Sequence, residues 1–310
     1  MTALSIVATL YRSAPYVAEF VARASAAAHQ FVGDDFEIVL VNDGSPDTSL
    51  ELAVGLTATV PQLRVVDLSR NFGHHKAMMT GLQQSRGAFV YLLDSDLEEQ
   101  PEWLSIFHAQ LQQDQADVVY GVQRARKGGT FERISGKLFY RVHRMLSGVT
   151  IPENVVTARL MTRRYVDALV QHDEREVFMA GLWLITGFKQ VPHVVDKLST
   201  SETTYNLRRK MAVLVNSITS FSNAPLIGIF YIGLTISLLA GIYTLYLVFN
   251  WLLANRAPGG WTSLIASVWL LGGLIISFIG VVGIYLAKIF SETKRRPYTI
   301  IRAVHGASRD

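Results

Sequence analysis

The sequence predicts an α/β domain with a mainly parallel sheet, followed by a two-helix transmembrane hairpin. Three observations lead to this fold class. Short β-rich runs alternate with helical stretches through residues 1–203, a pair of carboxylates follows one of those runs, and two long runs, 225–253 and 262–288, are almost free of charge. An alternation of strands and helices favours a parallel sheet with helices on both faces.

The elements of the first 203 residues follow one another in a regular order. The β-rich runs are 4–10, 36–41, 63–68, 88–93 and 117–121. Helical stretches are expected at 15–31, in the segment that ends near residue 60, and from 74 to 82. The turn clusters Asn42-Asp43-Gly44-Ser45-Pro46 and Asn71-Phe72-Gly73 separate strand from helix.

Asp94 and Asp96 come directly after the apolar run 88–93 and are separated by one residue. On an extended chain, residues two apart point to the same side, so both carboxylates can reach one hard cation or its bound phosphates. In open α/β sheets, ligands collect outside the carboxyl ends of the strands, where this pair falls. We therefore predict a site for Mg²⁺ or Mn²⁺. A solvated strand end or a helix cap is the alternative.

Each uncharged run is longer than the ~20 residues that span a bilayer. Two buried core helices are the alternative, which the short polar link 254–261 between the runs disfavours. Basic residues flank the pair on both outer sides: Arg208, Arg209, Lys210, Lys288, Lys294, Arg295, Arg296 and Arg302. The link holds only Arg256, so we expect residues 1–203 and both termini in the cytoplasm, beneath an inner (plasma) membrane. Trp251 and Trp261 would lie at the opposite interface.

The composition narrows the function further. The formal net charge of +4 is compatible with nucleic-acid binding, but the basic residues concentrate at the membrane flanks and in segment 124–127. Anionic lipid and a phosphate substrate explain them, so no nucleic-acid partner is expected. The chain has no cysteine, which excludes disulfides and thiolate chemistry. Neither a dinucleotide fingerprint nor a P-loop occurs, and charged residues interrupt any secretory signal at the amino end.

Residues 204–224 are expected to form an amphipathic juxtamembrane helix. Apolar residues recur there at helical spacing, after the basic residues at 208–210. Such a helix would lie on the membrane and direct the site towards it. The alternative is a helix packed on the soluble domain. Residues 289–310 would form a cytoplasmic basic tail.

Several segments together resemble one family. They are Val41-Asn42-Asp43-Gly44-Ser45, Leu68-Ser69-Arg70-Asn71-Phe72-Gly73, Asp94-Ser95-Asp96-Leu97, Arg159-Leu160-Met161, and the tail from Gly283-Ile284-Tyr285 to Lys294-Arg295-Arg296-Pro297-Tyr298. Over nearly its whole length, the chain resembles the family 2, GT-A-type glycosyltransferases that load sugars onto polyprenyl phosphate. These include dolichol-phosphate mannose synthase and bacterial undecaprenyl-phosphate glucosyltransferases. The resemblance implies a GT-A nucleotide-diphospho-sugar transferase domain at 1–203 and a homo-oligomer.

The resemblance also implies roles for particular residues. Tyr11 and Asp43 would line the base pocket, together with Thr9, which stands where the family has Pro. Asp94 would lie near the ribose and the metal, and Asp96 would bind the metal directly. Glu98 falls where the family has a metal-coordinating Gln, and it keeps an oxygen ligand. Arg124 and Arg133 match basic positions that hold the diphosphate or the acceptor phosphate, a task that suits guanidinium groups.

One departure from the family bears on the mechanism, because Thr157 stands where the family has an Asp that is often assigned as a base. A lipid phosphate has a second pKa near ~6, so its nucleophilic oxygen is already ionised at neutral pH. We therefore expect Asp94, Asp96 and Arg133 to carry the catalysis by stabilising the leaving diphosphate.

The predicted reaction is inverting transfer of a sugar from a nucleotide-diphosphate donor, expected to be a UDP-hexose, to membrane polyprenyl phosphate. In bacteria the acceptor would be undecaprenyl phosphate. The product would feed modification of a cell-surface glycan such as lipopolysaccharide O-antigen. Two alternatives stay open: a transferase acting directly on a nascent glycan, and a catalytically weak homologue that serves as a membrane scaffold. The lack of the Gln-x-x-Arg-Trp motif of processive synthases disfavours the first, and the intact acidic residues disfavour the second.

Overall fold

The computed structural model describes residues 2–123, 154–197, 219, 222–254 and 260–306. The chain forms two units. The first comprises Met1–Tyr140, Ile151–Tyr205 and Arg295–Asp310, and the second Arg141–Thr150 and Asn206–Lys294. Most of the predicted juxtamembrane helix 204–224 lies outside the described residues, as do Arg124 and Arg133.

The first unit is an α/β domain. Its strands are β1 (Leu4–Leu10), β2 (Phe36–Asn42), β3 (Leu63–Leu68), β4 (Phe89–Leu92), β5 (Val118–Gln123), β6 (Val155–Thr162), β7 (Gln190–Val195) and β8 (Ile301–His305). Its helices are α1 (Val17–Val32), α2 (Ser49–Leu56), α3 (His74–Gln84), α4 (Trp103–Gln113), α6 (Arg163–Leu169) and α7 (Met179–Ile185).

The sheet has the order β7-β5-β6-β4-β1-β2-β3-β8. Strand β1 pairs in parallel with β2 and β4, and β2 with β3, in continuous registers that begin at Leu4↔Phe36, Leu4↔Phe89 and Ile38↔Leu63. β5 and β7 are also parallel. β6 is antiparallel to β4 and β5, and β8 is antiparallel to β3. The predicted mainly parallel sheet is confirmed as a mixed sheet with a parallel centre.

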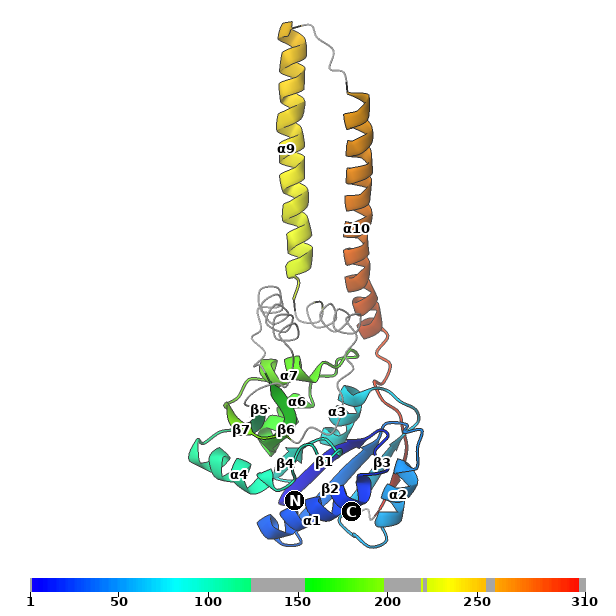
Figure 1. Cartoon of the computed structure of the whole chain (residues 1–310), viewed down its shortest axis with the longest axis vertical. Helices are drawn as coiled ribbons and strands as arrows, with labels where there is room; N and C mark the ends of the chain where they lie inside the picture. The colour runs from blue at the N-terminus through cyan, green and yellow to red at the C-terminus, as the bar shows by residue number, and fades with distance from the viewer. Residues whose placement is uncertain (1, 124–153, 198–218, 220–221, 255–259, 307–310) are drawn as a thin grey trace. The chain divides into compact units, whose positions relative to one another are not determined.

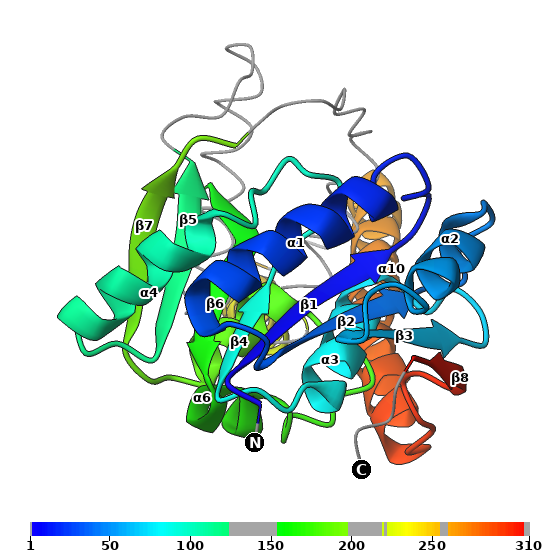
Figure 2. The ribbon, with the colours of Figure 1, turned by 90° about the horizontal axis from the view of Figure 1, so that it is seen from below.

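Helices cover both faces of this sheet (Figure 2). Helix α1 contacts β1, β2, α2 and α4 on one face, and α3 contacts β1 and β2. The chain runs outward from β1 to β3 and then returns to β4, so a right-handed crossover brings α3 to the opposite face. Every residue of β1, β2 and β3 is buried, because helices cover both sides of these strands. Each large side chain buried here, such as Phe20, contributes roughly 1.5–3 kcal/mol.

Strands β1 and β3 match the predicted runs 4–10 and 63–68, and β2, β4 and β5 agree within two residues. Strand β8 was not expected, since the sequence indicated only a basic tail there. Its Ile301–His305 segment pairs with β3 at the edge of the sheet, and Arg302 Nη1 lies 3.4 Å from Asp67 Oδ2. The end of the chain is therefore part of the α/β domain.

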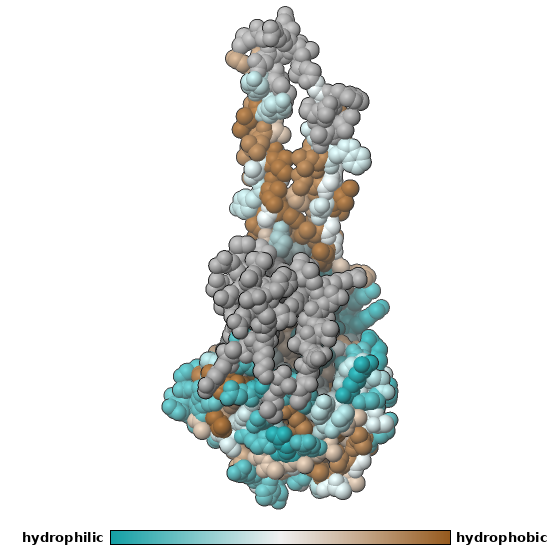
Figure 3. Space-filling view, viewed as in Figure 1, coloured by the Kyte–Doolittle hydropathy of each residue, from teal (hydrophilic) through white to brown (hydrophobic). Residues whose placement is uncertain are grey.

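The second unit contains α9 (Ala224–Ala254) and α10 (Trp261–Thr293), which contact each other (Figure 1). The Tyr285 hydroxyl donates to Ser222 O at 2.7 Å. Apolar side chains are exposed along both helices (Figure 3), and two stretches, Ala224–Tyr243 and Ser267–Thr293, are candidate membrane spans by length and composition. The two helices agree with the predicted runs 225–253 and 262–288. The structure does not describe the side chains of Trp251 and Trp261, so their predicted place at the interface stays a prediction.

Candidate active site

The candidate active site lies where the parallel strands end. β1 and β4 are neighbours, yet the chain leaves β1 for β2 on the other side, so the direction of winding reverses between them. Such a reversal leaves a crevice outside the carboxyl ends of the strands, which is where open α/β sheets bind ligands. Thr9 is near the end of β1, Asp43 follows β2, and Asp94 follows β4. The topology thus brings these predicted residues to one edge.

Asp43 fixes the loop that leads into α3. Asp43 is 2% exposed, and its carboxylate accepts backbone hydrogen bonds from Phe72 N at 2.7 Å and Gly73 N at 3.0 Å. Burial raises the pKa of Asp43, although these two bonds oppose that shift. The loop also passes Gly44 so closely that an added Cβ would lie 2.4 Å from Asn71 N. Asp43 therefore has an organising role in addition to the predicted contact with a base.

His74 links the ends of two strands. Its Nδ1 is hydrogen-bonded to Thr9 Oγ1 at 3.0 Å, and its Nε2 lies 3.3 Å from Asp94 Oδ1. The second contact is within ion-pair distance, although Asp94 Oδ1 makes no full hydrogen bond to any residue that the structure describes. Sequence reasoning treated His74 only as the start of a helix. Its position at the first residue of α3 was the signal that it faces the strand ends.

Tyr11 follows β1 and is 48% exposed, so its ring is free to stack on a planar ligand. The Arg12 guanidinium lies 5.8 Å from the centre of that ring. Arg12 has a φ of 56°, which is uncommon for a residue other than glycine. Its backbone N donates to Ser45 Oγ at 2.7 Å, which holds this turn beside the segment after Asp43.

Asp94 is held from the neighbouring strand β6. Thr157 Oγ1 donates to Asp94 Oδ2 at 3.0 Å, and Thr157 N donates to Glu99 Oε1 at 2.9 Å. Burial opposes the ionisation of Asp94, but His74, Lys197 and this hydroxyl outweigh it and lower the pKa. Asp94 is therefore ionised at neutral pH.

Asp96 lies in a tight turn after β4. Its Oδ1 accepts a hydrogen bond from Glu98 N at 3.0 Å, and the intervening Leu97 has a φ of 60°. A positive φ at leucine is strained, and such strain is found preferentially at functional sites. Burial and the neighbouring charge of Asp94 raise the pKa of Asp96.

Lys197, just after β7, reaches the same acidic turn. Its Nζ lies 3.1 Å from Glu98 Oε2 and 3.8 Å from Glu99 Oε1. Burial opposes the charge of Lys197, but Glu99, Glu98 and two aspartates together raise its pKa. Glu99 is 0% exposed, and burial with the Asp94 charge raises the pKa of Glu99 to about 8. Sequence reasoning missed Lys197 and Glu99.

Asp94 and Asp96 are the carboxylates that would hold a divalent cation bound together with a substrate phosphate. Asp94 Oδ1 is buried and makes no hydrogen bond to any residue that the structure describes, although His74 Nε2 lies 3.3 Å away, so this oxygen has room in its bonding for a cation. Within the described part of the chain, no group of three or more His, Asp or Glu side chains surrounds a single point. Mg²⁺ commonly takes one or two carboxylates and completes its shell with substrate phosphates and water. Glu98, the third predicted ligand, is paired with Lys197 instead.

Behind the acidic residues, β6 buries a guanidinium. Arg159 is 1% exposed, its Nε donates to Thr157 O at 3.0 Å, and its Cζ lies 2.9 Å from the centre of the Trp183 ring. Burial lowers the pKa of Arg159 to about 9. Arg159 therefore supports the strand segment that presents Thr157 to Asp94.

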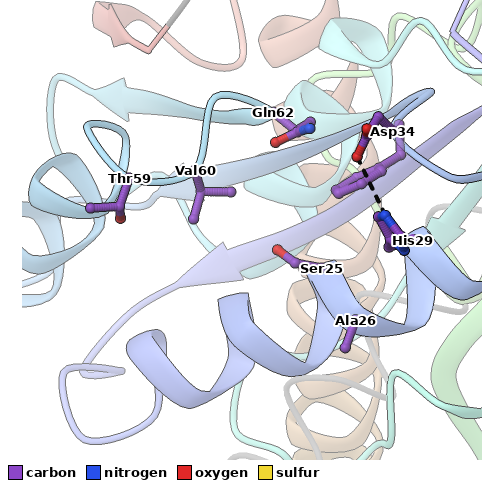
Figure 4. Close-up of a pocket in the computed structure, with 8 residues that line it drawn as sticks. Ser25, Ala26, His29, Asp34, Thr59, Val60 and Gln62 are labelled. Carbon is purple, nitrogen blue, oxygen red and sulfur yellow. Dashed lines mark ion pairs between the residues drawn. The ribbon is translucent and has the colours of Figure 1, made fainter.

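A cavity of about 350 Å³ lies at the opposite end of the strands (Figure 4). Ser25 and His29 of α1 line it together with Gln62, which precedes β3. His29 Nε2 and Asp34 Oδ1 are 3.6 Å apart at its rim, and both side chains are mostly exposed. Ligands of open α/β sheets bind at the carboxyl ends instead. We therefore assign the chemistry to the acidic edge.

The chain has a GT-A-like α/β fold with acidic residues at the carboxyl ends of its central strands, and its family supports glycosyltransferase activity. The chain belongs to glycosyl transferase family 2, whose model matches residues 5–170. A Mycobacterium tuberculosis (strain CDC 1551 / Oshkosh) protein that is named as a glycosyltransferase is 51% identical over 98% of this chain and 89% of its own length.

Two further relatives carry more specific names. A prophage bactoprenol glucosyl transferase homolog of Escherichia coli (strain K12) is 32% identical over 87% of this chain and 89% of its own length. A bactoprenol glucosyl transferase of Shigella phage SfII is 31% identical over 87% of this chain and 88% of its own length. The alignments span most of each chain.

Proposed function

We propose that this protein transfers a hexose-type sugar from a UDP-linked donor to polyprenyl phosphate and inverts the anomeric centre. The observation that carries the proposal is the combination, in one chain, of a family 2 domain with an acidic strand end and two helices suited to a membrane. A lipid acceptor explains why a sugar-transferring domain has such helices. The names of the bactoprenol glucosyl transferases support the same acceptor class.

The chain's own residues would position the donor. Asp94 and Asp96 would hold Mg²⁺ or Mn²⁺, which when bound supplies positive charge to the departing diphosphate. Tyr11, Thr9 and Asp43 would form the nucleotide side of the crevice. Arg124 and Arg133 would hold the diphosphate and the acceptor phosphate by charge-assisted hydrogen bonds. The assignment of these two arginines rests on the sequence alone.

No carboxylate base is required in this proposal. Thr157 stands where the resemblance implies an Asp in the family, and its hydroxyl donates a hydrogen bond to Asp94. The phosphate oxygen of the acceptor is ionised at neutral pH, so it attacks without losing a proton to the enzyme. The work of the site is to align that oxygen behind the anomeric carbon and to stabilise the leaving group.

The proposed topology places residues 1–203 and both termini in the cytoplasm, with the link 254–261 on the other side of the membrane. Basic residues before the first helix and after the second helix support this topology. The acceptor's phosphate would then lie at the same membrane surface as the donor. Homo-oligomerisation is a further expectation, and mass photometry of the detergent-solubilised protein measures it directly.

Turnover assays test the acceptor and the donor together. Purified protein in detergent is given Mg²⁺, undecaprenyl phosphate, and one nucleotide sugar at a time from a panel of UDP- and GDP-linked hexoses. We expect one UDP-hexose to yield a lipid-linked sugar and free UDP. Release of UDP without a lipid product, or transfer only to a glycan acceptor, would refute the polyprenyl-phosphate proposal.

A further inference from the structure

A second cavity of the α/β domain, with a volume of about 510 Å³, lies against α3. It is lined by Thr80 of α3, by Asp173 and Arg175 from the connection between α6 and α7, and by Arg295, Tyr298 and Thr299 from the segment after α10. None of these residues belongs to the acidic site. Two guanidinium groups against one carboxylate give the cavity a net positive charge.

One hydroxyl of this cavity makes no full hydrogen bond to any residue that the structure describes. Tyr298 is 8% exposed, and its hydroxyl is buried without a hydrogen bond among the described residues. The neighbouring Thr80 hydroxyl donates to Lys76 O at 3.0 Å and lies 2.8 Å from Thr299 Oγ1, so it is already engaged. Burial and the nearby Asp173 charge raise the pKa of Tyr298, which keeps the phenol as a neutral donor. A buried donor without an acceptor is costly and calls for a bound group.

The charged groups are arranged to receive an anion. The side chain of Arg175 is 13% exposed, and its two terminal nitrogens donate to the Asp173 carboxylate at 2.7 and 3.1 Å. This pairing offsets the Asp173 charge and fixes the guanidinium. Arg295 adds the unbalanced positive charge, and its φ of 47° shows a backbone held in an uncommon conformation. Guanidinium and hydroxyl donors together suit phosphate oxygens.

Chain connectivity places this cavity close to a membrane surface. The candidate span Ser267–Thr293 ends two residues before Arg295. Two residues of extended chain reach at most ~7 Å. Basic residues directly after a membrane span commonly meet anionic headgroups. We propose that this cavity binds a phosphate group, carried on the headgroup of an anionic phospholipid or free in solution.

Thermal unfolding of the full-length protein in a neutral detergent tests the proposal. The ligands are dihexanoyl phosphatidylglycerol, dihexanoyl phosphatidylcholine and inorganic phosphate, each titrated at constant ionic strength, and the shift of the midpoint yields a Kd. Two variants change the cavity, Arg295→Gln and Tyr298→Phe. Arg296→Gln is the matched control, because Arg296 carries the same charge one residue further on but does not line the cavity.

We expect phosphatidylglycerol to stabilise the wild type and Arg296→Gln with similar Kd values, and to bind about tenfold more weakly to Arg295→Gln and severalfold more weakly to Tyr298→Phe. If inorganic phosphate shows the same dependence on these variants, the ligand is a free phosphate, and if it has no effect, the ligand is the lipid headgroup. Equal weakening in Arg295→Gln and Arg296→Gln would mean diffuse surface attraction and would overturn the site. The site would also be overturned if both cavity variants unfold at the wild-type midpoint without ligand and bind phosphatidylglycerol with an unchanged Kd.

Discussion

Thr157 Oγ1 donates a hydrogen bond to Asp94 Oδ2 across 3.0 Å, so the residue for which the resemblance implies an Asp in the family supports a carboxylate here instead of supplying one. The same residue donates its backbone N–H to Glu99. Two acidic residues of the loop after β4 are therefore oriented from β6. This relationship predicts how substitutions of Thr157 should behave.

Thr157→Ala should retain substantial transfer, whereas Thr157→Asp should be less active than Thr157→Ala. Alanine removes one hydrogen bond to a charged group, which lowers the folding stability by roughly 1.5–3 kcal/mol at most. Aspartate would place a second carboxylate about 3 Å from Asp94, and two such groups do not both ionise readily. Steady-state rates with saturating donor compare the two. An aspartate variant that exceeds the wild type would show that position 157 works best as a base.

Arg133→Ala should lose more activity than Thr157→Ala, because the proposed Arg133 contact is made to the reacting phosphate and is worth roughly 1.5–3 kcal/mol in the transition state. The Thr157 hydroxyl only positions Asp94. The KM for polyprenyl phosphate and the rate at saturating donor are measured for both variants. A normal rate in Arg133→Ala beside an inactive Thr157→Ala would exclude Arg133 as the phosphate clamp.

Asp96→Asn should lower turnover by about 100-fold or more, because the proposed cation would lose a ligand and the leaving group its stabilisation. Chelation with EDTA should have the same effect on the wild type, and added Mg²⁺ or Mn²⁺ should reverse it. Asp34→Asn is the control, since its side chain is 81% exposed at the opposite end of the strands. Full activity of Asp96→Asn, or of the chelated wild type, would remove the metal from the mechanism.

The pKa of Glu99, raised by burial and by the charge of Asp94 to about 8 from the usual 4.5, predicts a pH-dependent stability. Between these two values, the folded protein keeps a proton that the unfolded chain releases, so this group's stabilising contribution falls as pH rises. Glu99→Gln should remove that slope. The lowered pKa of His75 acts in the opposite sense near pH 6.5, and it cancels when the two profiles are subtracted.

Thermal midpoints in detergent from pH 5 to pH 8 give both profiles. The midpoint of the wild type relative to that of Glu99→Gln should be highest at the acidic end and should fall towards pH 8. Parallel profiles would mean that Glu99 titrates in the folded protein as it does in the unfolded chain.

Strands β1 and β3 were predictable because both are buried on two faces, and a strand buried on two faces has a nearly continuous apolar sequence. Strand β6 was missed because Arg159 interrupts its run. The Trp183 ring and the backbone oxygens of Thr157 and Val156 make that charge acceptable in a central strand. Strand β8 is five residues long and pairs with a segment more than 200 residues earlier, a contact that no local pattern encodes. Among the site residues, Asp94 and Asp96 follow a recognisable strand. Lys197 is about 100 residues further along the chain, and the order of the strands in the sheet brings it to the same turn.

The cysteine-free chain makes the topology directly testable. A single cysteine at Ser199 should be labelled by a membrane-impermeant maleimide only after the cells are opened. A cysteine at Arg256 should be labelled in intact cells, because the basic flanks retain both outer segments in the cytoplasm. The cysteine-free parent gives the background. The reverse pattern would invert the proposed orientation and separate the site from cytosolic nucleotide sugars.

The pairing of β8 with β3 predicts that Gly306→Ala loosens the end of the chain. Gly306 has a φ of 99°, and a Cβ there would lie 2.3 Å from Leu63 O, so either the tail or β3 must shift. Gly33→Ala is the control, because its φ of 63° is also positive but no described atom lies within 4 Å of the added Cβ. Overpacking costs about 1–3 kcal/mol, and backbone strain alone costs about 1–2 kcal/mol. The free energies of global unfolding should therefore be similar in the two variants, whereas local opening of β3 should differ. Amide hydrogen exchange in Leu63–Leu68 should accelerate in Gly306→Ala but not in Gly33→Ala. Equal protection of β3 in both variants would show that β8 does not stabilise the edge of the sheet.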